Sequence, residues 1–171
     1  MKRVALFLLL ALPVFGDVSP EYKVKAVLLF NFAKFVSWPA ESLGGQDAPI
    51  IIGVLGDDPF GGALEDAIRG RNAGGHPIAI RRYERLEDVK GCHLLFISAS
   101  EKSRQAEILS SFKTNAVLTV GDTEDFIQQG GMIKVTLVDR KPHLEINARA
   151  AERVGLKIQA QLLELAKEER R

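Results

Sequence analysis

Apolar side chains dominate residues 19–39, near the start of the chain. They recur every three or four positions, as on a helix, and they cover more of its circumference than a single stripe would. These positions are Val24, Val27, Leu28, Leu29, Phe30, Phe32 and Phe35. Only a narrow polar strip interrupts them, at Lys23, Asn31 and Lys34. A helix of this kind has to be buried on several sides, either inside its own domain or against another chain.

Both ends of this predicted helix carry sequence signals. Ser19 is a suitable N-cap, and Pro20 suits the first helical position, where its missing N–H is not needed. Trp38 and Pro39 predict the end, because the residue before a proline is displaced from helical backbone geometry. We therefore expect about five helical turns between these points.

The middle of the chain alternates short apolar runs with helical segments. The run at residues 50–55 is continuously apolar, as in a strand buried on both faces. Further strands are predicted at residues 78–81, 93–97 and 116–120, with helices at residues 60–68 and 101–112. Strands that alternate with helices indicate a parallel sheet covered by helices.

The pattern changes after residues 130–131. Residues 132–138 and 143–147 alternate apolar and polar positions, which predicts a β-hairpin around a turn at residues 139–142. Apolar residues then recur at helical spacing over residues 148–167, which predicts one long final helix. The predicted fold class is α/β, a mainly parallel sheet flanked by helices in a Rossmann-like three-layer arrangement. A C-terminal β-hairpin and the long final helix complete it.

Residues 1–16 have the features of a cleaved secretory signal peptide. The basic residue Lys2 precedes a short apolar run at residues 4–12, and Gly16 occupies the last position before a plausible cleavage site. The run is too short to cross a bilayer core of ~30 Å. We therefore expect residues 17–171 to form a single domain that works outside the cytoplasm.

The charge of the chain is nearly balanced, with 23 Lys and Arg residues against 22 Asp and Glu residues. No stretch interleaves basic and aromatic residues as nucleic-acid-binding surfaces do, so nucleic acid is not an expected partner. Cys92 is the only cysteine, which excludes an internal disulfide. The apolar run beside it, residues 94–97, predicts burial of Cys92 as a small hydrophobic side chain.

A glycine-rich acidic segment follows the first predicted strand. Gly53 and Gly56 lie where nucleotide-binding folds keep a phosphate loop, but their spacing matches neither G-x-G-x-x-G nor a P-loop. Asp57 and Asp58 would also repel a phosphate, so we interpret the segment as a turn and a helix cap. A phosphoryl-accepting receiver domain is not indicated either, because Ser98 follows the later strand where an aspartate is required.

The remaining residues that could carry chemistry are scattered. The histidines, His76, His93 and His143, lack metal-ligand partners at helical or loop spacing. Ser98 and Ser100 are not part of a nucleophile elbow. We therefore predict no catalytic residues, no metal site and no cofactor.

Three segments together carry the motifs of one protein family, in the same order. Residues 22–39 contain a helix followed by the pattern Phe-x-x-Trp-Pro, residues 130–133 and 144–147 resemble the family's hairpin, and residues 150–166 resemble its last helix. These segments span essentially all of the mature chain. In this combination the chain resembles the YfiR/HmsC-like periplasmic family.

The resemblance implies a non-enzymatic regulator in the periplasm. Members of the family restrain an inner-membrane diguanylate cyclase by binding its periplasmic sensing domain, which lowers cyclic di-GMP signalling. An outer-membrane lipoprotein with a peptidoglycan-binding domain can draw the regulator away and so promote biofilm formation, and homodimers are expected. The chain departs from relatives that carry paired cysteines, because it has Cys92 alone.

The excess apolar surface of the first helix suggests where a partner binds. We predict partner contacts for Phe30, Phe35 and Trp38, because large aromatic side chains bury much area with few rotamers to restrict. The same three side chains could instead belong to the core, and the sequence leaves both interpretations open.

A second class of function is a periplasmic module that binds a small ligand. In that case the pocket is expected at the carboxyl ends of the parallel strands, with Gly56, Asp57 and Ser98 in its wall. A hydrolase is the third and least supported class, because no catalytic set of residues is present in the sequence.

Overall fold

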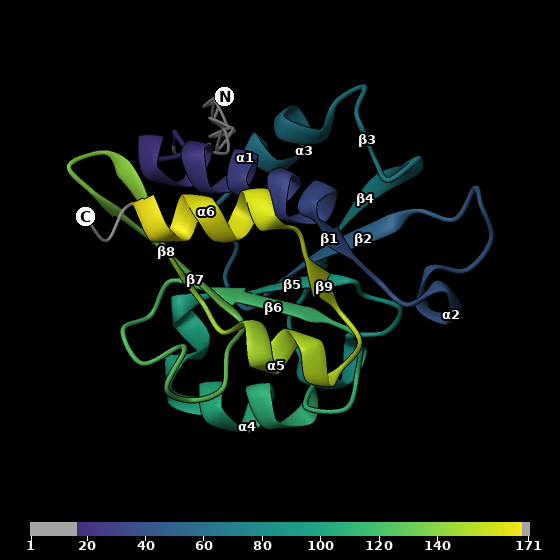
Figure 1. Cartoon of the computed structure of the whole chain (residues 1–171). Coiled ribbons are helices and arrows are strands. Elements are labelled where there is room, and N and C mark those ends of the chain that lie inside the picture. Colours follow the sequence, from purple (N-terminus) through teal and green to yellow (C-terminus); the bar gives the residue numbers. More distant parts are fainter. Residues whose placement is uncertain (1–16, 169–171) are drawn as a thin grey trace, which may run out of the picture.

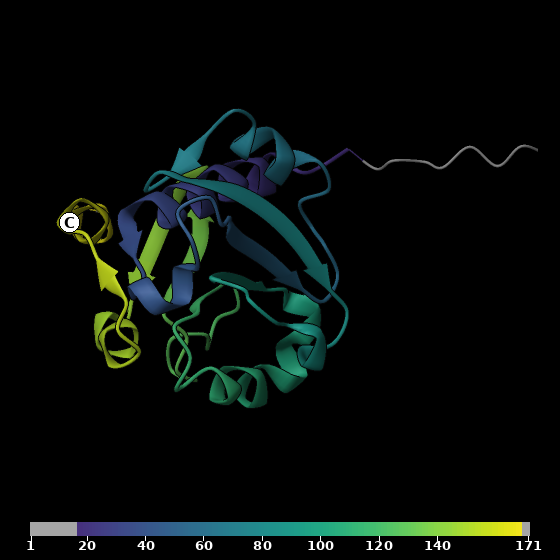
Figure 2. The same ribbon diagram turned by 90° about the vertical axis from the view of Figure 1, so that its right-hand side faces the viewer.

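The computed structural model describes residues 17–168 (Figure 1). The predicted signal peptide, residues 1–16, lies outside the described residues. The chain is a mixed α/β structure in which helices pack against a curled, seven-stranded mixed sheet (Figure 2). The order of the strands across this sheet is β3-β4-β2-β5-β6-β7-β8.

The strands of this sheet come from all parts of the chain after the first helix. They are β2 (Ile50–Leu55), β3 (Asn72–Ala73), β4 (His76–Tyr83), β5 (Leu94–Ile97), β6 (Leu118–Gly121), β7 (Ile133–Val138) and β8 (Lys141–Ile146). The central pairings, β4-β2, β2-β5, β5-β6 and β6-β7, are parallel, whereas the outer pairings β3-β4 and β7-β8 are antiparallel. The mainly parallel sheet that the sequence predicts is therefore confirmed for its central strands.

The regular three-layer arrangement expected from the sequence is only partly present. The connection from β4 to β5 contains only a short 3-10 helix, η1 (Leu86–Asp88), and the connection from β6 to β7 contains turns but no helix. The longer connections hold α3 (Ala63–Ile68), which follows β2, and η2 (Ala99–Arg104) with α4 (Gln105–Ser111), which follow β5. Two crossovers therefore lack a covering helix and the layers are incomplete, and the sheet is curled (Figure 2).

Side chains of the central strands alternate between two hydrophobic clusters. Leu94 and Phe96 of β5 join the cluster beneath the first helix, whereas Leu95 and Ile97 join the cluster beneath α4. This alternation is the expected period of two along a strand. It explains why the run of Ile50–Leu55 is buried at every position, as the sequence predicts for a strand covered on both faces.

The first helix, α1 (Pro20–Phe35), begins where the sequence predicts and ends earlier. The Ser19 hydroxyl accepts a hydrogen bond from the backbone N–H of Tyr22, as expected of an N-cap. The predicted end at Trp38 and Pro39 is wrong, because Val36 already has an extended backbone (φ −112°, ψ 138°). It begins the short strand β1 (Val36–Ser37), which pairs with a late segment of the chain. The short helix α2 (Ala40–Leu43) follows Pro39.

The C-terminal hairpin is present, with a tighter turn than the sequence suggests. Strands β7 and β8 pair along their whole length, so that only Asp139 and Arg140 form the turn. Both have positive φ, 51° and 65°, as in the two-residue hairpin turns that match the twist of the strands. Pro142 lies within β8, where its missing N–H is tolerated because β8 is an edge strand.

The prediction of one long final helix is wrong. The segment is divided into α5 (Ala148–Arg153), the strand β9 (Lys157–Ile158) and α6 (Ala160–Glu168). Gly155 ends the first part with a φ of +80°, a conformation that interrupts a helix and that glycine adopts at low cost. β9 then pairs with β1, which brings α6 beside α1 (Figure 1).

Candidate functional site

The first helix presents a buried face to the protein and a mixed face to solvent, where Val27 lies among the exposed side chains Lys23 and Lys34. Its buried residues are Lys25, Ala26, Leu29, Phe30, Phe32 and Ala33. On the outer face, Val27 is 44% exposed, and Val24 and Leu28 are half-buried. Val27 is therefore one of the few large apolar side chains that the described part of the chain exposes.

A groove runs between α1 and α3, which lie side by side at the top of Figure 1. We call it the α1–α3 groove. Its volume is about 480 Å³, and its lining residues are Asp17, Val18, Lys23, Val27, Gly62, Ala63, Asp66, Ala67 and Arg71. The apolar side chains Val18, Val27 and Ala67 lie among two acidic and two basic groups. A surface with an apolar centre and charges of both signs around it suits a protein partner better than a single-charge ligand.

Phe30 and Phe35, two of the three aromatic residues predicted to contact a partner, lie in different environments. Phe30 is 7% exposed, and the Arg71 guanidinium lies 5.1 Å from the centre of its ring. Because Arg71 lines the α1–α3 groove, Phe30 supports this groove from the protein side. Phe35 is half-buried, with the Lys34 ammonium 5.3 Å from its ring centre.

Trp38, the third predicted aromatic residue, is 7% exposed and anchors the segment after β1. Its indole Nε1–H donates a hydrogen bond of 3.1 Å to the backbone oxygen of His93. The two rings meet edge to face, with centres 6.1 Å apart. In the single chain, Trp38 and Phe30 thus contribute to the core, and partner contact by any of the three aromatic residues stays a prediction.

A buried ion pair beneath α1 was not predicted from the sequence. Lys25 Nζ lies 2.7 Å from Asp122 Oδ2, and the side chains are 3% and 7% exposed. The Tyr22 hydroxyl donates to the same oxygen at 2.9 Å, and Glu21 is a second ion-pair partner of Lys25. Burial, together with the Asp122 carboxylate, raises the pKa of the Tyr22 phenol above its usual range, so that Tyr22 stays a donor.

The position of Lys25 on the helix is the sequence feature that indicates a buried ion pair. Lys25 is two residues from Lys23, which turns it roughly 200° around the helix axis, away from the polar strip and into the apolar face. A cation in that position requires a buried acidic partner. The sequence alone does not show which acid, because Asp122 is distant in the chain.

The three residues predicted to line a ligand pocket do come together. Gly56 and Asp57 follow β2, and Ser98 follows β5, the adjacent parallel strand. The space above Gly56 is filled, however, by the side chains of Ser100 and Glu101. Ser100 Oγ also accepts the N–H of Asp57 at 2.9 Å, which holds the two loops together. The ligand-binding role of these residues stays a prediction.

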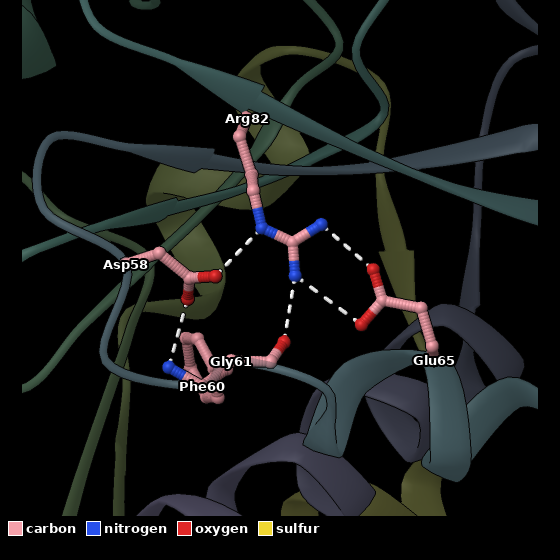
Figure 3. Close-up of polar contacts among 5 residues, drawn as sticks. All are labelled: Asp58, Phe60, Gly61, Glu65 and Arg82. Atoms are coloured by element: carbon pink, nitrogen blue, oxygen red, sulfur yellow. Dashed lines mark hydrogen bonds and ion pairs between the residues drawn. The ribbon is translucent and has the colours of Figure 1, made fainter. Parts of the chain in front are cut away.

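Asp58, the next residue, belongs to a polar cluster centred on Arg82 of β4 (Figure 3). The guanidinium donates to Asp58 Oδ2 at 2.6 Å, to the Gly61 carbonyl at 2.7 Å and to both carboxylate oxygens of Glu65. Asp58 Oδ1 accepts the N–H of Phe60 at 2.8 Å. The hydrogen bond from Arg82 lowers the pKa of the Glu65 carboxyl. This cluster fastens the β2–α3 connection to β4.

Other residues considered in the sequence also have structural roles. Cys92 is 7% exposed, as predicted, and burial raises the pKa of its thiol to about 12. Within residues 17–168, no three His, Cys, Asp or Glu side chains are placed to hold a metal ion. The same residues include no helix with the length and apolar content required to cross a membrane.

A family model described as YfiR/HmsC-like matches residues 22–167, which is most of the chain. A search of the curated proteins gives no match.

Proposed function

Because the chain belongs to the YfiR/HmsC-like family, a family of periplasmic regulators of cyclic di-GMP signalling, we propose that it restrains a diguanylate cyclase. In this proposal the chain binds the periplasmic sensing domain of an inner-membrane diguanylate cyclase and thereby lowers cyclic di-GMP. The family is regulatory and non-enzymatic. The single observation that carries the proposal is the family match over residues 22–167.

The outer surface of α1 supports a protein-binding role and suggests where contact occurs. Val27 is exposed at the wall of the α1–α3 groove, whereas most apolar side chains of the same helix are buried. An exposed apolar residue over a groove can be desolvated by a partner side chain, which is the usual source of binding energy at an interface. We therefore place the cyclase contact at the α1–α3 groove.

The three aromatic residues have different parts in this proposal. Phe35 is half-buried and offers surface directly to a partner. Phe30 acts through Arg71, whose guanidinium it holds at the groove. Trp38 fixes the chain at the end of α1 through its hydrogen bond to His93, and its own contact with a partner is the weakest of the three proposals.

Two further partners follow from the family resemblance alone. We propose that the chain forms a homodimer, and that an outer-membrane lipoprotein with a peptidoglycan-binding domain competes with the cyclase for it. Leu165 of α6, the helix beside α1, is 47% exposed and offers a further apolar side chain for such contacts (Figure 1). The pairing of β9 with β1 precedes α6 and holds it in this position.

The function can be tested in cells that produce this protein. Deletion of the gene is expected to raise cyclic di-GMP, and the wild-type chain supplied in trans is expected to lower it again. A strain whose cyclase lacks its periplasmic domain serves as the control and is expected not to respond. Unchanged cyclic di-GMP after deletion of an expressed gene would contradict the proposal.

A further inference from the structure

A second cavity lies on the side of the sheet that faces α4, away from the α1–α3 groove. α4, the β6–β7 connection and α5 enclose it, and all three lie below the sheet in Figure 1. Its volume is about 480 Å³, a size typical of sites for small molecules. The lining residues are Leu109, Phe112, Lys113, Thr119, Gln128, Gln129, Gly130, Met132, Ala150 and Arg153.

The floor of this cavity is apolar because it lies at the junction of the two hydrophobic clusters. Leu109 and Phe112 belong to the cluster beneath α4, and Met132 and Ala150 belong to the cluster beneath α1. Each of the four is at most 7% exposed. The floor thus offers a site for a flat apolar body without any rearrangement of the core.

The polar groups that face the cavity are mainly hydrogen-bond donors. Thr119 is 1% exposed, and its hydroxyl oxygen accepts the N–H of Met132 at 3.2 Å, which leaves the hydroxyl hydrogen to donate. Gln129 Oε1 accepts from Gln105 at 2.9 Å, so the amide NH₂ group of Gln129 remains as a donor. These donors suit a ligand that carries acceptor oxygens.

The cavity also has two cations and no carboxylate among its lining residues. Within the described residues, neither Lys113 nor Arg153 has an ion-pair partner, in contrast to Arg82, Arg85 and Arg104. Two unpaired cations beside an apolar floor produce a local positive potential. Such a potential favours an anionic group on any ligand that enters.

The rim of the cavity is held in place by buried polar contacts. Gln105, 1% exposed, accepts from the Thr123 hydroxyl at 2.5 Å and donates to Gln129, which ties the β6–β7 connection to α4. Phe126, fully buried, fills the space beside Gly121 and Gly131 at the two ends of this connection. The donors are therefore preorganised, which lowers the cost of binding.

We propose that this cavity binds a small organic anion. Its apolar body lies on the apolar floor described above, and its anionic group lies between Lys113 and Arg153. The site is separate from the α1–α3 groove, and the proposal does not depend on the cyclase-binding function. It adds a ligand site to a chain whose family match implies only a regulator.

A purely structural role for the two cations makes a different prediction. Lys113 follows the end of α4, and Arg153 is the last residue of α5, so each could simply offset the negative end of a helix. In that case, reversal of both charges would lower thermal stability and leave ligand binding unchanged. The two roles can therefore be separated by measuring binding and stability on the same variants.

The test uses a matched pair of fluorescent probes on residues 17–171. 8-Anilinonaphthalene-1-sulfonate has an apolar ring system and an anionic group, and N-phenyl-1-naphthylamine has the same rings without the charge. The Lys113→Glu/Arg153→Glu variant removes the proposed anion site. The Lys102→Glu/Arg149→Glu variant is the control, because it makes the same charge change at exposed positions outside the cavity.

We expect the sulfonate to bind one site on the wild-type chain about tenfold more tightly than the neutral probe. The Lys113→Glu/Arg153→Glu variant should lose at least this tenfold difference, and the control variant should retain it. In ¹⁵N–¹H spectra, the sulfonate should shift the Gln129 side-chain amide and the Thr119 amide. Equal binding of both probes, unchanged binding by the charge-reversed variant, or shifts confined to the α1–α3 groove would overturn the proposal.

Discussion

Lys25 and Asp122 form an ion pair inside the protein, although they are 97 positions apart in the chain. Lys25 is on the buried face of α1, and Asp122 directly follows β6. The pair therefore fastens the first helix to the carboxyl end of a central strand. The position of α1 in the fold depends on this attachment.

Removal of one partner of this pair should destabilise the fold. Lys25→Met leaves the Asp122 carboxylate buried with only the Tyr22 hydroxyl as a close donor, and we expect a loss of about 3 kcal/mol in the free energy of unfolding. Lys25→Met/Asp122→Leu should cost less than Lys25→Met alone, because it leaves no buried charge without a partner. Glu21, the other partner of Lys25, is 48% exposed and stays solvated. Urea unfolding of both variants measures this, and equal losses would contradict the account.

Trp38 allows a test of its role in the core. Trp38→Phe removes the indole donor, but the His93 carbonyl still accepts the N–H of Leu118 at 2.8 Å, so we expect a loss of about 1–2 kcal/mol. Trp38→Ala should cost about 3–5 kcal/mol, because it also leaves a cavity. Phe35→Ala, at a half-buried position, is the comparison and should cost less. A Trp38→Ala variant as stable as wild type would show that Trp38 is not a core residue.

The stability of the protein should fall in mild acid because of His93. Its Nδ1 accepts the N–H of Ile51 at 3.0 Å, and its Nε2 contacts the Ser42 carbonyl at 2.9 Å, so the folded state holds a neutral ring. Burial lowers the pKa of His93 below its usual 6.5. As the pH falls below about 6.5, the unfolded chain binds a proton before the folded chain does, and the contribution of His93 to stability is lost.

Urea unfolding between pH 7.5 and pH 5 tests this prediction. The wild-type chain should lose stability over this range, and the less stable His93→Gln variant should show a smaller loss. A variant with the same pH dependence as wild type would assign the effect to other groups.

Cys92 should be unreactive in the folded protein. With a pKa of about 12, its thiolate fraction at pH 8 is roughly 10⁻⁴, and the side chain is 7% exposed. Ellman's reagent should therefore label the native protein at least ~1,000-fold more slowly than the urea-unfolded chain. Rapid stoichiometric labelling of the native protein would contradict the burial of Cys92.

The sequence predicts the features that local residue patterns determine. The strand Ile50–Leu55 is found at its predicted bounds because a short apolar run rich in β-branched residues favours a strand covered on both faces. The start of α1 at Pro20 is correct because its cap lies in the adjacent residue, Ser19. The hairpin is present because its alternation and its turn are contiguous in the chain.

The features that depend on distant parts of the chain could not be predicted. The pairing of β1 with β9 ends α1 early and divides the final helix, yet each strand has only two residues and no distinct pattern. The Lys25–Asp122 pair likewise requires knowledge of which loop lies beneath α1. In the candidate site, the groove beside Val27 depends on the packing of α1 against α3, which helical spacing alone does not specify.

We propose that the α1–α3 groove binds the periplasmic domain of a diguanylate cyclase, and paired variants can test this. Two variants make the same change at exposed valines: Val27→Asp in the groove, and Val138→Asp at the end of β7, where the valine is 59% exposed. Circular dichroism should first show that both variants are folded.

Isothermal titration calorimetry with the purified periplasmic domain of a cyclase from the same organism is the most direct measurement. We predict that the wild-type chain and Val138→Asp bind alike and that Val27→Asp binds at least ~10-fold more weakly, because a buried charge replaces an apolar contact. Wild-type affinity in Val27→Asp, or no binding by the wild-type chain, would contradict the account.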